Sequence, residues 1–272
     1  MFAFELIIPI YMGLIIFFIL RSVGADPDAT PEAKSSAGIL SQFFMVFYTP
    51  YITMINVRFI VTSMVEDKKT KMRETLRLMS LSRWNYTMSF FVYQSCMSLW
   101  NGVIIGAIMF NNVNAFTIED DRFKNSVTYI FIAIFLCVGM IGYSMALSTL
   151  FYDTKVGQNM SQLAIFIPLI LFVAVVNKTG FAGSFLYLTM LTPIGPASAL
   201  IGIITAGPAI PGFNPLINVD HLNVYVSWFF LFFNIPFWIS IYIYLDQVMP
   251  NTYGIQRSPF FCCQKKQKIK EF

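Results

Sequence analysis

The chain has 272 residues, of which 57% are hydrophobic and only 12% are charged; its net charge is +4 and its mean hydropathy is +0.66. A soluble domain carries about 25% charged residues, so these values exclude a water-soluble globular enzyme. The apolar runs are continuous, whereas strands of a membrane barrel alternate polar and apolar residues. We therefore expect an all-α polytopic membrane protein that forms a single domain over residues 1–272.

Six apolar stretches are each long enough to cross a hydrocarbon core of about 30 Å as a helix. They cover residues 4–20, 39–56, 86–110, 126–152, 160–176 and 223–245.

A seventh apolar stretch, residues 185–206, is interrupted by Pro193, Gly195 and Pro196. Proline removes an amide donor and glycine adds flexibility, which breaks a regular helix. This pattern predicts a pair of short helices that dips into the outer side of the membrane before the last span.

The basic residues favour six spans with both termini on the inner side of the membrane. Most of the 18 Lys and Arg residues then lie inside, whereas a seventh span would move the basic tail outside. Arg58 lies at the inner end of the second span, where its long side chain is expected to extend toward the inner surface. The first span is expected to be retained, because no convincing cleavage site follows it. The residues placed inside are Lys68, Lys69, Lys71, Arg73, Arg77, Arg83, Lys155, Arg257, Lys265, Lys266, Lys268 and Lys270.

The sequence lacks the residues that several kinds of chemistry require. The chain has one His and four Cys without CxxC spacing, which argues against haem and structural zinc sites. The nucleotide-binding sequence GxxxxGK[ST] does not occur, and the spans contain no chain of Asp, Glu or His. We therefore expect no enzyme activity, no catalytic, cofactor-binding or metal-binding residues, no nucleic-acid partner, and no ion or proton pathway.

The loop after the second span carries the most informative polar sequence. Apolar residues follow near-helical spacing, with charged residues between them. This pattern predicts an amphipathic helix over residues 66–82, which lies on the inner membrane surface or against a partner. A solvated basic connector that only fixes topology is the alternative. The apolar members are Met72, Leu76, Met79 and Leu81, and the charged residues between them are Arg73, Glu74 and Arg77.

This loop resembles the first cytoplasmic segment of the membrane domains of the ABC transporter A subfamily, whose pattern is EKExxxKExxxxMGL. Three short groups of residues occupy the matching positions, and they are Asp67, Lys68 and Lys69; Arg73, Glu74 and Thr75; and Met79, Ser80 and Leu81.

A second match follows the last span, where YLDQVMPNTYGIQRSPFF is similar to the family pattern Y(L/I)(D/E)xVxPGxYGxxRPWYF. The start FELIIPI and the interrupted LTPIGPASALIG also resemble family segments. The residues that fit the second pattern are Tyr244, Asp246, Val248, Pro250, Tyr253, Gly254, Arg257 and Phe261.

The chain also departs from these patterns. Lys69 replaces an acidic residue, Ser80 replaces the Gly of MGL, and Asn251 replaces the Gly after Pro250. We expect the chain to lack the ATPase domain to which the family pattern leads after the last motif, because the sequence stops at Phe272.

The resemblance implies an ABC-2 type transmembrane domain. Family members move lipids, and the inner helix docks into a groove on an ATPase domain. The residues that would form this partner-coupling helix are Asp67, Met72, Arg73, Glu74, Leu76, Arg77 and Met79.

Two hypotheses about function follow from the resemblance. The first is a lipid-related permease subunit that takes its ATPase from a separate chain, pairs with a second membrane half, and carries lipid in a cleft between spans two and five. The second is a non-transporting structural subunit of a larger membrane complex, motivated by the missing ATPase and by the departures from the family patterns.

Overall fold

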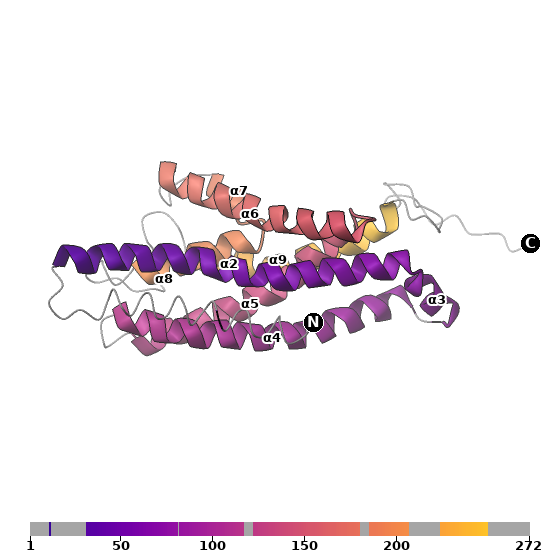
Figure 1. Cartoon of the computed structure of the whole chain (residues 1–272), viewed down its shortest axis with the longest axis horizontal. Helices are drawn as coiled ribbons and strands as arrows, with labels where there is room; N and C mark the ends of the chain where they lie inside the picture. The colour runs from indigo at the N-terminus through magenta and orange to yellow at the C-terminus, as the bar shows by residue number, and fades with distance from the viewer. Residues whose placement is uncertain are drawn as a thin grey trace, which may run out of the picture.

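The computed structural model describes Tyr11 and residues 31–80, 82–116, 122–179, 185–206 and 224–249. Every regular element in these ranges is an α-helix, which confirms the predicted all-α class for this part of the chain. Apart from Tyr11, the predicted span 4–20 lies outside the described residues. The longer helices run along the long axis of an elongated bundle (Figure 1). The helices are α2 (Pro31–Lys69), α3 (Met72–Leu78), α4 (Arg83–Phe116), α5 (Arg122–Ser148), α6 (Thr154–Thr179), α7 (Phe185–Thr189), α8 (Ile194–Ala206) and α9 (Val224–Val248).

Three of the described helices are long and apolar enough to cross a membrane. They overlap the last three predicted spans. Their membrane-compatible segments are Val127–Ser148 in α5, Thr154–Val175 in α6 and Val224–Val248 in α9.

Two helices run well beyond the apolar stretches that predicted them. α2 has 39 residues and α4 has 34, where the apolar stretches covered only 39–56 and 86–110. At 1.5 Å per residue, α2 is about 58 Å long, nearly twice the thickness of a hydrocarbon core. Its last turns therefore extend past the apolar part of the bundle, and they carry Lys68 and Lys69.

α5 is the central helix of the described bundle. In its apolar segment 67% of the residues are buried, compared with 22% in the segments of α6 and α9. It contacts α2, α4, α8 and α9. Gly102 of α4 allows a close approach, because a Cβ atom there would lie 3.1 Å from the Cα of Ile134 in α5. The partner of this glycine is thus a helix of the same chain.

The interruption predicted within residues 185–206 is present as a turn between α7 and α8. Two side chains of α9 hydrogen-bond to backbone carbonyls of this turn. Asn234 Nδ2 donates to the oxygen of Met190 at 3.0 Å, and Trp238 Nε1 donates to that of Leu191 at 3.1 Å. Helix ends leave such carbonyls without intrahelical partners, so α9 stabilises the break.

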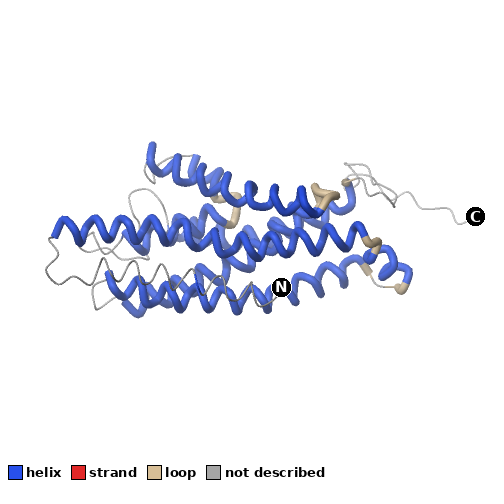
Figure 2. Tube along the Cα trace, in the orientation of Figure 1, coloured by secondary structure: helices blue, strands red, loops and turns tan. Residues whose placement is uncertain are grey.

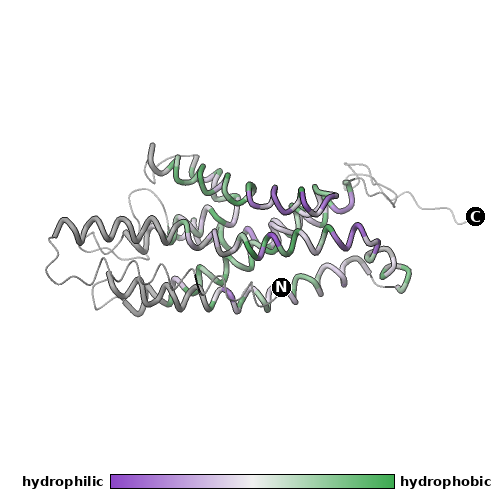
Figure 3. Tube along the Cα trace, viewed as in Figure 1, coloured by the Kyte–Doolittle hydropathy of each residue, from purple (hydrophilic) through white to green (hydrophobic). Residues whose placement is uncertain are grey.

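Three connections lie at one end of the bundle, which we call the α3 end. Figure 2 shows there the turns that join α2 to α3 and α3 to α4, together with the loop between α5 and α6. Hydrophilic stretches of α2 and α6 also lie toward this end in Figure 3. Polar segments of α2 and α6 therefore lie toward the α3 end.

Candidate functional site

The last residues of α2 fix this helix to three other elements. Asp67 accepts a hydrogen bond from the Tyr86 hydroxyl of α4. Lys68 Nζ donates to the carbonyl oxygen of Ser148 at 2.6 Å, where a cation suits the carboxyl end of α5. We call Asp67, Lys68 and Lys69 the anchor residues.

Lys69 forms an ion pair with Asp153, in which Nζ and Oδ1 are 2.7 Å apart and both side chains are about half exposed, at 49% and 51%. Asp153 directly precedes α6, and the hydrogen bond from Lys69 is the main cause that lowers the pKa of its carboxyl group. Lys69, which departs from the family pattern, thus has an acidic partner. No local sequence pattern marks Asp153, because its partner is 84 residues away.

The segment predicted to be a coupling helix is not one helix over residues 66–82. α2 continues through Lys69, a turn follows, and α3 has only seven residues. Lys71 before α3 and Ser80 after it have positive φ angles of 58° and 71°. These left-handed conformations reverse the chain on both sides of α3, which divides the predicted helix into separate elements.

Ser80 occupies the position at which the family pattern has glycine. At a φ of 71°, a side chain with a Cβ atom is strained and glycine is not. The backbone therefore gives a physical reason for the glycine of the MGL pattern, and this chain keeps the conformation with serine.

α3 and the turn after it present apolar side chains at the surface. Met72 is 53% exposed, Leu78 is 88% exposed and Met79 is 72% exposed, whereas Leu76 is half-buried. We call Met72, Leu78 and Met79 the α3 apolar surface. The periodicity did not single out Leu78, which is the most exposed of the three. The predicted residues Arg73, Glu74 and Arg77 lie in α3, and their side chains are outside the described part of the structure.

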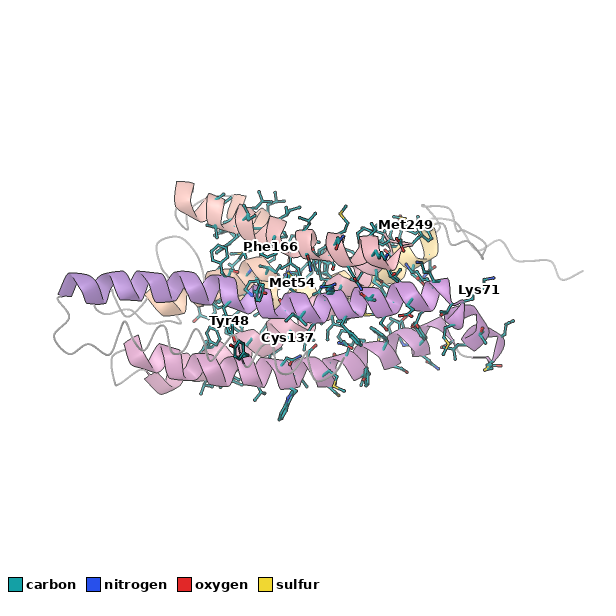
Figure 4. All side chains as sticks on the ribbon, viewed as in Figure 1. Tyr48, Met54, Lys71, Cys137, Phe166 and Met249 are labelled. Atoms are coloured by element: carbon teal, nitrogen blue, oxygen red, sulfur yellow. The ribbon has the colours of Figure 1, made fainter. Side chains whose placement is uncertain are left out.

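The second family motif begins on α9. Tyr244 is partly exposed and Asp246 is half-buried, and the helix ends at Val248. Figure 4 shows Met249, just after α9, and Lys71, just before α3, at the same end of the bundle. The structure thus brings the start of the second motif to the α3 end. The other predicted motif residues, Pro250, Tyr253, Gly254, Arg257 and Phe261, lie outside the described residues.

These features define a helical membrane domain with a short, exposed element braced at one end. Residues 22–251, most of the chain, match the family described as ABC-2 family transporter protein. The chain therefore belongs to the ABC-2 transporter family, in which membrane domains generally act with an ATPase and a second membrane half.

Two curated relatives agree with this assignment. The chain is 22% identical over 257 residues to ABC transporter A family member 11 of Arabidopsis thaliana. The aligned region covers 87% of this chain and 26% of the relative. The chain is also 22% identical over 278 residues to ABC transporter A family member 9 of the same plant. That aligned region covers 89% of this chain and 28% of the relative. The chain spans about a quarter of the length of these relatives. They confirm the resemblance to the ABC transporter A subfamily.

Proposed function

We propose that this chain is the permease part of a lipid-related ABC transporter and couples to an ATPase through α3. The observation that carries the proposal is the α3 apolar surface, held at the end of α2 by the anchor residues. Protein interfaces combine apolar side chains at their centre with polar groups at the rim. Met72, Leu78 and Met79 supply the first kind, and the sequence of α3 also contains charged residues of the second kind.

The anchor residues would make α3 a firm contact and not a loose loop. Asp67, Lys68 and Lys69 bond to α4, to the end of α5 and to the residue before α6. A force applied to α3 would therefore reach several membrane helices together. An ATPase that changes shape when it binds nucleotide would need such a rigid contact in order to rearrange the membrane helices.

The ATPase itself would lie outside residues 1–272, because these contain no GxxxxGK[ST] sequence. We propose that an ATPase domain outside these residues and a second membrane half complete the transporter. The α3 end would face the inner side with both termini, six spans would cross the membrane, and α7 and α8 would form an outer re-entrant pair. The basic residues near the α3 end support this orientation.

A photo-crosslinking experiment tests the coupling surface. A benzophenone amino acid replaces Leu78, which is 88% exposed, and, as a control at the beginning of α9, Tyr225, which is 66% exposed. In native membranes, the probe at position 78 should crosslink to a polypeptide with an ATPase domain, and the probe at position 225 should not. A complex in which position 78 contacts no ATPase would contradict the proposal.

A functional experiment tests the transport part of the proposal. The purified assembly, in vesicles with fluorescent phospholipid, should move lipid in an ATP-dependent way. Leu78→Asp places a charge on the α3 apolar surface and should reduce the ATP-dependent rate at least tenfold, whereas Leu78→Met keeps the apolar contact and should preserve it. No ATP-dependent movement in the intact assembly would favour the structural-subunit hypothesis.

The structural-subunit hypothesis is not favoured. It drew on the missing ATPase and on the departures at Lys69, Ser80 and Asn251. Asn251 lies outside the described residues, and the fold accommodates the other two departures. Lys69 pairs with Asp153, and Ser80 adopts the left-handed conformation that glycine would adopt. Neither departure therefore requires that the coupling surface has lost its role.

A further inference from the structure

Arg58 carries a charge in the part of α2 that precedes the anchor residues. It lies 11 residues before Lys69, which is about 16 Å along the helix axis. It lies just beyond the predicted second span, residues 39–56, where an arginine side chain reaches the level of the lipid headgroups.

A small hydrogen-bond network holds the arginine. Arg58 Nη2 donates to Gln158 Oε1 of α6 at 3.3 Å, and Gln158 Nε2 donates to Thr62 Oγ1 at 3.1 Å. Thr62 Oγ1 in turn donates to the backbone oxygen of Arg58 at 2.7 Å. Gly157 permits the close helix approach, because a Cβ atom there would be 3.2 Å from a methyl group of Val61.

This network is neutral apart from the guanidinium group. No carboxylate in the described ranges lies within ion-pair distance of Arg58, whose side chain is exposed. Gln158 uses both ends of its amide within the network, so it orients the arginine without neutralising it. The planar group has several N–H donors, and only one makes a bond to the described residues. The guanidinium group of Arg58 is therefore an oriented cation, and most of its N–H donors make no bond to the described residues.

We propose that Arg58, positioned by Gln158 and Thr62, binds the phosphate of a glycerophospholipid from the leaflet on the α3 side. Arginine binds phosphate through paired N–H donors, which gives both charge and direction. Tyr51 and Ile55 lie on the same face of α2, two turns and one turn toward the outer end. Tyr51 is 37% exposed and Ile55 is half-buried, so acyl chains would lie along an apolar surface beside the phosphate.

This inference deepens the lipid role in the proposed function, on whose membrane orientation it rests. It concerns one binding site and needs no ATPase. Its failure is therefore distinguishable from failure of the coupling proposal, which is tested at Leu78.

The test measures lipid binding to the full chain in detergent by native mass spectrometry. The probes are dioleoyl phosphatidylglycerol, dioleoylglycerol, which has the same acyl chains without phosphate, and inorganic phosphate. Arg58→Gln should weaken binding of the phospholipid at least tenfold and leave binding of dioleoylglycerol unchanged. Lys155→Gln is the matched control: it removes an equal charge from the exposed start of α6 and should change phospholipid binding less than twofold.

Several outcomes would overturn the proposal. These are equal phospholipid binding by the native chain and Arg58→Gln, equal losses in Arg58→Gln and Lys155→Gln, and Arg58-dependent binding of inorganic phosphate without binding of phospholipid. Release of a membrane protein partner by Arg58→Gln, with no change in lipid binding, would show that a partner's carboxylate is the counter-charge.

A second variant keeps the test decisive if Arg58→Gln does not fold. Arg58→Lys retains the charge but not the paired donors. It should lower phospholipid affinity severalfold and leave dioleoylglycerol binding unchanged. Equal phospholipid affinity of Arg58→Lys and the native chain would count against recognition by the guanidinium group.

Discussion

The hydroxyl group of Tyr143 in α5 donates a 2.8 Å hydrogen bond to the carbonyl oxygen of Ala164 in α6. Ala164 lies four residues before Pro168, which is inside the helix and has no amide hydrogen to donate to it. The tyrosine therefore supplies from a neighbouring helix the bond that the proline omits. Polar groups without partners are costly inside a membrane, so this contact explains how α6 tolerates its proline.

Tyr143→Phe should lower the free energy of unfolding by about 1 kcal/mol, because it leaves the Ala164 carbonyl without its donor. The ring contact with Trp238, whose centroid is 4.7 Å away, would remain. Reversible denaturation in mixed micelles measures the change. In a Pro168→Ala background the backbone amide can bond to Ala164, so Tyr143→Phe should cost less there. The same cost in both backgrounds would contradict this account.

Asn234→Leu should destabilise the chain by about 1–3 kcal/mol, because the buried carbonyl of Met190 loses its donor at the α7–α8 turn. Ser240→Ala is the control on the same helix. Ser240 is exposed, and its hydroxyl bonds to the backbone oxygen of Pro236 in its own helix, so its loss should have little effect. Thermal unfolding of the purified chain measures both, and equal shifts would refute a special role for Asn234.

Ser80→Gly should stabilise the chain by about 1 kcal/mol, because glycine adopts the φ of 71° without strain. The same change inside α3, Thr75→Gly, should destabilise by roughly a few tenths of a kcal/mol, because glycine is less favourable than threonine in a helix interior. Unfolding midpoints of the two variants should therefore move in opposite directions. A loss of stability in Ser80→Gly would show that serine makes a compensating contact.

The Lys69–Asp153 pair should stabilise the chain at neutral pH and not in acid. The pKa of Asp153 is lowered from its usual 3.8, mainly by the hydrogen bond from Lys69, so the folded state favours the charged carboxylate. That contribution is present above the unfolded pKa and is lost as the pH falls through the lower, folded pKa. Asp153→Asn, which can still cap α6, should lower the unfolding midpoint slightly at pH 7.

Two conditions check that the effect of Asp153→Asn comes from charge. The difference between the variant and the native chain should disappear below the folded pKa of Asp153. It should also shrink at high salt, because both side chains are about half exposed and exposed pairs are screened. A difference that persists in acid would point to the cap and not to the ion pair.

The sequence predicted the parts of the fold that depend on local pattern. Long apolar runs identified the residues of α5, α6 and α9, and Pro193 marked the break between α7 and α8. The end of α2 was missed, because the four charged residues Glu66 to Lys69 were assigned to a separate helix over residues 66–82 and not to the helix that contains the second span. They are helical in the structure, and at least three of them bond to remote partners.

The candidate site also combines features that the sequence predicts with features that depend on contacts between remote residues. The resemblance located α3 and the anchor residues, whereas the periodicity misjudged the length of the helix. Positive φ angles at Lys71 and Ser80 divide that segment, and neither residue type demands such a conformation. The bonds of Asn234 to Met190 and of Arg58 to Gln158 arise from helix packing, which a single sequence does not encode in any local pattern.

Pro50 has a mechanical consequence for α2. It removes one backbone hydrogen bond within the helix, and Thr53 Oγ1 bonds to the Pro50 carbonyl at 2.8 Å, a contact that also favours bending. The helix beyond it, residues 51–69, is an arm about 28 Å long. This arm carries Arg58 about 12 Å from Pro50 and the anchor residues at its tip. A small tilt at Pro50 would therefore move the anchor residues about twice as far as Arg58, so a displacement imposed at the tip would reach Arg58 with roughly half its amplitude.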